Sequence, residues 1–306
     1  MDFTTKENSF IVFENRYNDL ASLLRGDNSG KLIMGEVNWF YSLIKYLIDN
    51  NYRVIHCKDN SHFFREYLNE KKKGNNVKLI MDYITIPMTI KHLLPDINNI
   101  YCMCYWGRDL DRVKKLGNVN NMNISLLNVL TPFNYLKENT YLGYDMKYLC
   151  GNIESIKYKK IGILWGKDIK YININLVKYL TSKGLQFYSV TNTPLNIDGV
   201  HNLGILSKKL WHQLLKDGRY VLSFGNPPSG PTILESLFYK KRLFGPQIQY
   251  PQSVHNKNIL FTDNLDFKNI FNLIIQNNDF IEHDEICNSL INSNNFNIRV
   301  KNIFNI

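Results

Sequence analysis

The stretch whose residue types and spacing best suit chemistry is FGNPPSGPTILES, residues 224–236. Gly225 and Gly230 permit unusual backbone angles and let a ligand approach the main chain closely. Pro231 suits the first turn of a helix, whose unpaired N–H groups and positive dipole end attract anions. Glu235 follows about one turn later, where its carboxylate can accept hydrogen bonds from ribose or sugar hydroxyls. The pattern predicts a phosphate-binding loop, but it also fits a strand-to-helix turn with an acid favoured by the helix dipole.

The glycine spacing in this loop differs from that of the dinucleotide fingerprint GxGxxG and of the Walker phosphate loop. If the loop is a binding site, a nucleotide sugar is therefore the kind of ligand that we expect. The residues of the loop expected to contact such a donor are Gly225, Pro228, Ser229, Gly230, Pro231, Thr232 and Glu235.

Other reactive residue types form no comparable pattern. The seven histidines contain no HxxxH or HExxH pair, and no GxSxG motif suggests a hydrolase. Asp109 and Asp111 form an Asp-x-Asp sequence far from the loop, and we interpret it as a surface turn. The five cysteines are scattered, which is typical of reduced structural thiols. We expect no metal site.

The elements that must position this loop alternate between strand-like and helix-like runs, which predicts parallel sheets covered on both faces. In the first half, the predicted strands are 10–13, 52–57, 76–84 and 100–106, and the predicted helices are 35–51 and 61–73. The first of these helices has an expected apolar face made of Val37, Phe40, Tyr41, Ile44, Leu47 and Ile48.

The same rhythm restarts after residue 150. The predicted strands are 160–166, 185–190, 220–224, 242–246 and 258–262, and the predicted helices are 173–183, 208–216 with Ser207 as N-cap, one from Pro231, and 267–276. We therefore expect two Rossmann-like domains, 1–150 and 151–285, followed by a tail, 286–306, that can pack back on the first domain.

The composition indicates a globular protein with sizeable cores: 306 residues, 44% hydrophobic and 21% charged. The net charge of +10 favours anionic partners, and a nucleic-acid-binding protein is one alternative. The lysines are spread along the chain, however, which is typical of solvated faces. We find no apolar run long enough for a membrane span and no signal peptide, so we expect a cytoplasmic protein.

The stretch His201–Pro246, HNLGILSKKLWHQLLKDGRYVLSFGNPPSGPTILESLFYKKRLFGP, resembles the donor-binding region of a known family. This is the N-acetylglucosaminyltransferase V family, the α-1,6-mannosylglycoprotein 6-β-N-acetylglucosaminyltransferases of glycosyltransferase family 18. Further similar stretches follow in the family's order: GEVNWF (35–40), TPFNYLKENTYLGYD (131–145) and ILWGK (163–167). The resemblance implies a GT-B fold, in which two Rossmann-like domains with parallel sheets face a cleft.

The resemblance also implies an activity: transfer of GlcNAc from UDP-GlcNAc to a glycan hydroxyl with inversion, without a required metal or further cofactor. Glu36 matches the family's general base, which takes the proton of the attacking hydroxyl. Glu235 matches a donor-site glutamate, and Lys167 can neutralise the diphosphate leaving group. Gly204, Ile205 and Leu206 precede a helix and can present backbone groups and an apolar wall to uracil.

The chain departs from the family's pattern at two places in the donor region. Ser229 stands where the family usually has an acid, and the segment after Gln247 is shorter and lacks a clear counterpart of a donor-binding lysine. A catalytically inactive GT-B domain that binds a nucleotide or glycan therefore stays open as an alternative, as does a GT-B epimerase.

Overall fold

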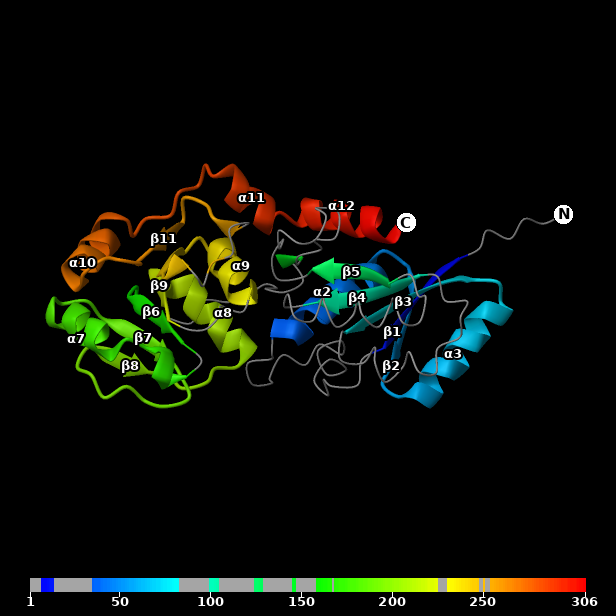
Figure 1. Cartoon of the computed structure of the whole chain (residues 1–306), viewed down its shortest axis with the longest axis horizontal. Helices are drawn as coiled ribbons and strands as arrows, with labels where there is room; N and C mark the ends of the chain where they lie inside the picture. Colours follow the sequence, from blue (N-terminus) through cyan, green and yellow to red (C-terminus); the bar gives the residue numbers. More distant parts are fainter. Residues whose placement is uncertain are drawn as a thin grey trace. The chain divides into compact units, whose positions relative to one another are not determined.

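The computed structural model describes residues 7–13, 35–82, 99–104, 124–128, 145–146, 158–166, 168–224, 230–247, 250 and 254–306. The chain divides into two compact units, each built around one sheet (Figure 1). Unit 1 comprises Met1–Leu24, Trp39–Tyr148 and Ser293–Ile306, and unit 2 comprises Arg25–Asn38 and Leu149–Asn292. No helix in the described ranges has the length and apolar character needed to span a bilayer.

The sheet of unit 1 is parallel throughout its described part. Its strands lie in the order β2-β1-β3-β4-β5, which is the flavodoxin-like order. They are short apolar runs, and β1 is almost completely buried, as expected for a parallel sheet with helices on both faces. The bounds are β1 (Asn8–Phe13), β2 (Arg53–Cys57), β3 (Asn76–Asp82), β4 (Ile100–Cys104) and β5 (Ile124–Asn128).

Helices from distant parts of the sequence cover the two faces of this sheet. Because successive strand residues point to opposite faces, Ile11 of β1 packs in one cluster with Phe63 of α3. Phe10 instead meets Phe304 of α12, with 5.5 Å between the ring centroids. The last helix of the chain therefore completes the core of the first sheet. The bounds are α2 (Gly35–Asp49), α3 (Asn60–Lys72) and α12 (Ser293–Phe304).

The buried face of α2 differs in part from the predicted one. Ile44 and Leu47 are buried as predicted, and Leu43 and Tyr46 join them. The prediction is wrong for Ile48, whose side chain is 46% exposed. Ile48 follows Leu47 by about 100° around the helix, which carries it past the edge of the apolar stripe.

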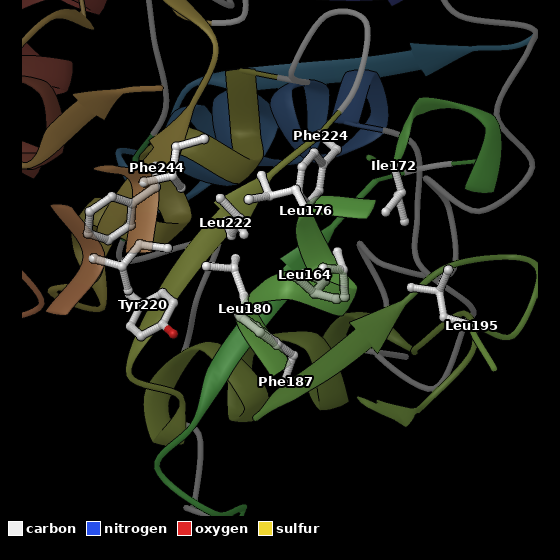
Figure 2. Close-up of a cluster of buried hydrophobic side chains, with 13 residues drawn as sticks. Leu164, Ile172, Leu176, Leu180, Phe187, Leu195, Tyr220, Leu222, Phe224 and Phe244 are labelled. Carbon is white, nitrogen blue, oxygen red and sulfur yellow. The ribbon is translucent and has the colours of Figure 1, made fainter. Parts of the chain in front are cut away.

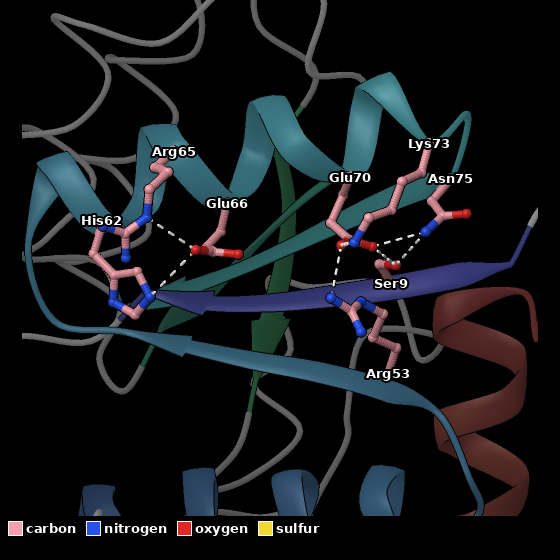
Figure 3. Close-up of polar contacts among 8 residues, drawn as sticks. All are labelled: Ser9, Arg53, His62, Arg65, Glu66, Glu70, Lys73 and Asn75. Carbon is pink, nitrogen blue, oxygen red and sulfur yellow. Dashed lines mark hydrogen bonds and ion pairs between the residues drawn. The ribbon is translucent and has the colours of Figure 1, made fainter.

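A buried carboxylate, Glu70 near the end of α3, ties this helix to the amino ends of the strands (Figure 3). Its oxygens accept hydrogen bonds from Ser9 Oγ at 2.6 Å and Asn75 Nδ2 at 2.7 Å. They also pair with Lys73 Nζ at 2.8 Å and Arg53 Nη2 at 2.9 Å. Burial by itself would raise the pKa of Glu70, but the hydrogen bonds and the Arg53 charge outweigh it and lower the pKa to about 2.

The described sheet of unit 2 is also parallel, with the order β11-β10-β9-β6-β7-β8. Read from the other edge, the strands follow the Rossmann order 3-2-1-4-5-6, in which β6 and β9 flank the reversal of strand order. The bounds are β6 (Gly162–Trp165), β7 (Phe187–Val190), β8 (Val200–Asn202), β9 (Tyr220–Ser223), β10 (Arg242–Gly245) and β11 (Ile259–Phe261).

Helices α7 and α10 pack with side chains of several strands in the main apolar cluster of unit 2 (Figure 2). Helix α8, N-capped by Ser207 as predicted, packs instead with α9, which in turn packs with α11. The bounds are α7 (Ile174–Ser182), α8 (Lys208–Asp217), α9 (Gly230–Phe238), α10 (Phe267–Gln276) and α11 (Glu285–Ile291).

The predicted architecture of two Rossmann-like halves with parallel sheets is confirmed. The predicted strands and helices are present, most with ends shifted by one or two residues, and helix 267–276 agrees at both ends. Strands β5 and β8 and helices α11 and α12 are not among the predicted elements.

Candidate functional site at the second sheet

The strand order of unit 2 places two loop starts side by side at the carboxyl ends of β6 and β9. These strands are neighbours, and the N–H of Phe224 donates a hydrogen bond to the carbonyl of Trp165 at 2.7 Å. A Cβ atom on Gly166 would lie 2.9 Å from the Phe224 carbonyl oxygen, so a side chain there would require a shift. Open α/β sheets bind ligands outside such a switch point.

The two chain segments that leave this point contain many of the predicted donor-binding residues. Lys167 follows β6, and Gly225, Pro228 and Ser229 follow β9; all four lie outside the described residues. Helix α9 begins at Gly230, so the predicted helix start at Pro231 is right to within one residue. The backbone of these two residues forms the first turn of α9.

Thr232 and Glu235 of α9 are both buried. The Thr232 carbonyl accepts a hydrogen bond from Ser236 Oγ at 2.6 Å within the helix. The Glu235 carboxylate contacts α8: Trp211 Nε1 donates to Oε2 at 2.8 Å, and His212 Nε2 lies 3.1 Å from Oε1. The predicted donor glutamate is therefore a buried group held between two side chains of the neighbouring helix.

The two partners of Glu235 are themselves packed against aromatic rings. Trp211 is almost completely buried and lies against Trp165, the last residue of β6, with 4.9 Å between ring centroids. His212 lies against Tyr239 at 5.7 Å. Neither Trp211 nor His212 is among the predicted site residues. The available signal was the adjacent Trp-His pair in the run KKLWHQLLK, residues 208–216.

The predicted uracil-binding residues lie between β8 and α8, at the same carboxyl edge of the sheet. Gly204 has a positive φ of 67°, with no heavy atom within 4 Å of a Cβ placed there. Ile205 is 56% exposed, whereas Leu206 is buried. Of the two apolar side chains, Ile205 is thus the one presented to solvent.

A buried phenol adjoins the carboxyl end of β9. Burial raises the pKa of Tyr250, and a contact with Ser223, the last residue of β9, offsets only part of this effect. The phenol therefore stays neutral across the physiological range.

The predicted base, Glu36, lies in the first turn of α2, and its side chain is outside the described part. Within the described ranges, no group of three or more His, Cys, Asp and Glu side chains is arranged to hold a metal ion.

No family model and no curated protein matches the chain. Among solved structures, a protein named as a UDP-N-acetylglucosamine 2-epimerase from Listeria monocytogenes aligns with 94% of this chain and 90% of its own, at 8% identity and a TM-score of 0.48. AviGT4, a glycosyltransferase involved in avilamycin A biosynthesis, aligns with 97% of each chain at 7% identity and a TM-score of 0.48. The lipopolysaccharide outer core galactosyltransferase WaaB aligns with 96% of this chain and 99% of its own, at 10% identity and a TM-score of 0.46.

Proposed function

We propose that the protein is a GT-B glycosyltransferase that transfers a sugar from a UDP-sugar, specifically GlcNAc from UDP-GlcNAc, to a glycan hydroxyl with inversion. The observation that carries this proposal is the switch point of unit 2. There the Gly- and Pro-rich loop leaves β9 beside the end of β6 and leads directly into α9. This is the part of an open α/β sheet where nucleotides bind, and the sequence resemblance covers the same stretch.

In this proposal the donor lies along the carboxyl edge of the second sheet. Residues 225–232 and the first turn of α9 hold the diphosphate, because unpaired N–H groups at a helix start bind anions. Lys167, next to the end of β6, neutralises the charge that develops on the leaving UDP. Glu235 accepts donor hydroxyls, and the segment 204–206 forms the wall for uracil.

The proposed chemical step needs one base. Glu36 takes the proton of the acceptor hydroxyl while the hydroxyl oxygen attacks the anomeric carbon. The bond from that carbon to the diphosphate oxygen breaks, and UDP leaves with the electron pair. Because attack and departure occur on opposite faces of the sugar, the configuration at the anomeric carbon inverts. Lys167 and the start of α9 would balance the charge of UDP without a metal.

A thermal-shift panel tests the donor site first. UDP, UDP-GlcNAc, UDP-glucose and GDP-mannose would be added in EDTA, each at up to millimolar concentration. A ligand at about 100 times its dissociation constant adds roughly 2.7 kcal/mol to the free energy of unfolding. We expect stabilisation by UDP and UDP-GlcNAc and none by GDP-mannose. The absence of a shift with every nucleotide would contradict the proposal.

The base assignment is tested by Glu36→Gln, with Asp49→Asn as a matched control at the other end of α2. Release of UDP from UDP-GlcNAc would be followed in the presence of a panel of glycan acceptors. We expect Glu36→Gln to bind UDP normally and to lose transfer, whereas Asp49→Asn keeps both. Binding of UDP without transfer by the wild type would favour the inactive domain, and a new UDP-sugar formed without acceptor would favour an epimerase.

A further inference from the structure

Two consecutive residues of α8 contact opposite oxygens of the same buried carboxylate. Trp211 Nε1 donates to Oε2 of Glu235 at 2.8 Å, and His212 Nε2 faces Oε1 at 3.1 Å. Neighbouring residues of a helix point about 100° apart. The Glu235 side chain therefore lies between the indole and the imidazole, which contact it from two sides.

This arrangement fixes the orientation of the carboxylate. The terminal torsion of a glutamate is broad, so an unrestrained carboxylate rotates readily. The indole N–H can only donate, and the Nε2 of His212 donates when it carries the proton. A carboxylate has about four acceptor positions, and the two contacts set the plane in which all of them lie. Trp211 is in turn held by Trp165, and His212 by Tyr239.

The two helices that meet at Glu235 each follow a segment assigned to one end of a nucleotide. Helix α8 follows the segment assigned to the base, and helix α9 follows the loop assigned to the diphosphate. Helix α8 starts at Lys208, three residues after the exposed Ile205, and Trp211 lies about one turn into it. Helix α9 starts directly after the loop assigned to the diphosphate, and Glu235 lies about one turn into it. Because the ribose of a nucleotide connects its base to its phosphates, a carboxylate that joins α8 to α9 is a candidate partner for the ribose.

We propose that Trp211 and His212 are positioning residues that orient Glu235 to accept hydrogen bonds from the ribose hydroxyls of a nucleoside diphosphate. This inference rests on the proposed function, since it assumes a nucleotide at the switch point of unit 2. It predicts that the site discriminates a ribonucleotide from a 2′-deoxyribonucleotide. The discrimination depends on donor groups in α8, which do not themselves touch the nucleotide.

Isothermal titration of UDP and 2′-deoxyuridine diphosphate measures this discrimination. We expect the wild type to bind UDP about tenfold more tightly, because one hydrogen bond to a charged group is lost with the deoxy compound. Trp211→Phe keeps an aromatic ring and removes the N–H. We expect the ratio of the two dissociation constants to fall to about twofold, with little change in the dissociation constant of the deoxy compound. Tyr188→Phe in β7 also keeps the ring and removes one hydrogen-bonding group, whose partner is the N–H of Lys159, and it should keep the wild-type ratio.

The possible outcomes separate this inference from the proposed function. A folded Trp211→Phe variant that keeps the tenfold ratio would overturn the positioning role and leave the donor site intact. Equal affinity of the wild type for the two nucleotides would overturn it in the same way. Failure of the wild type to bind either nucleotide would overturn the proposed function together with the inference.

A second pair of variants covers the case in which Trp211→Phe does not fold. His212→Leu removes the donor to Oε1, whereas His212→Gln keeps an amide that can donate. We expect the preference for UDP to be lost with Leu and largely kept with Gln. A role limited to packing would give the two variants equal ratios, and that result would overturn the inference.

Discussion

Glu70 in unit 1 and Glu235 in unit 2 are both buried carboxylates on helices that flank a parallel sheet, but their surroundings differ. Glu70 lies at the amino ends of the strands and contacts two cations, a hydroxyl and an amide. Glu235 lies in the helix that leaves the carboxyl end of β9, and its contacts include an indole and an imidazole.

The difference shows how to tell a stabilising carboxylate from a candidate ligand group. Around Glu70, contacts from four residues match the number of acceptor positions of a carboxylate, and the two cations balance its charge. This end of the sheet is opposite to the edge where α/β proteins bind ligands. Around Glu235, the two contacts described above come from α8, and α9 starts at the edge of the sheet where α/β proteins bind ligands. We therefore expect loss of Glu70 to affect stability and loss of Glu235 to affect nucleotide binding.

The largest effect is expected for Glu70→Ala. Removing the carboxylate takes the acceptor from Ser9 and Asn75 and the counter-charge from Arg53 and Lys73, whose side chains are 45% and 53% exposed. A hydrogen bond to a charged group contributes about 1.5–3 kcal/mol, so we expect a loss of about 3 kcal/mol in total. Urea denaturation followed by circular dichroism should show this loss. Glu66→Ala, at a more exposed ion pair of the same helix, should cost under about 1 kcal/mol. Equal losses of stability in the two variants would contradict the larger stabilising contribution assigned to the buried Glu70.

The contribution of Glu70 to the free energy of unfolding should also depend on pH. The folded pKa of Glu70, about 2, is below that of an unfolded glutamate, about 4.3. Its contribution is therefore complete above about pH 4.5 and is lost as the pH falls toward 2, by about 3 kcal/mol in total. Urea midpoints between pH 6 and pH 2.5 should fall more steeply for the wild type than for Glu70→Gln. Parallel curves of urea midpoint against pH for the two proteins would contradict the lowered pKa of Glu70.

A smaller effect, on binding rather than on folding, is expected for Glu235→Gln. The amide cannot accept on both sides, so it cannot keep the contacts from both Trp211 and His212 while accepting a donor hydroxyl. We expect UDP affinity to fall by about 2 kcal/mol, roughly 30-fold, measured by isothermal titration. Glu282→Gln, an exposed acid of the same unit, should bind UDP like the wild type. Unchanged affinity in Glu235→Gln would make Glu235 a structural residue like Glu70.

The smallest effect is expected at Lys78, a buried cation of β3. Burial lowers the pKa of Lys78, and no ion pair joins it to another described residue. Because burial disfavours the ammonium charge, Lys78→Met should raise the free energy of unfolding by about 1 kcal/mol. Lys72→Met, an exposed substitution, should change it by less than about 0.5 kcal/mol. Destabilisation by Lys78→Met would indicate that the ammonium group has a stabilising role.

Much of the fold could be predicted from the sequence, because local signals coincide with its elements. Ser207 begins α8 as an N-cap, Gly218 ends it, and the apolar run of β9 is followed at once by Gly and Pro. Strand β8 has three residues, of which His201 and Asn202 are exposed, so it carries no apolar pattern. Helix α12 contains many Asn residues and owes its place to long-range contacts such as that of Phe296 with Tyr46.

The candidate site could be predicted only in part. The residue types of the loop and of Glu235 were visible in the sequence, since the loop follows a strand and Glu235 lies about one turn into the helix after it. The contacts of Glu235 with Trp211 and His212 join residues that are 24 and 23 positions apart on different helices. No local periodicity relates such positions, because their proximity depends on how α8 and α9 pack. The same holds for the adjacency of β6 and β9, which depends on the strand order.

The packing of Phe304 on Phe10 and Tyr101 also has a consequence for biosynthesis. The first strand leaves the ribosome long before the helix that covers its face, and at usual elongation rates the delay is on the order of tens of seconds. Unit 2 is encoded largely by one continuous stretch between these two segments, so it can fold during that delay. The half that is translated first is therefore the half whose core is completed last, because Phe10 and Tyr101 gain their contacts with Phe304 only when translation reaches the end of α12.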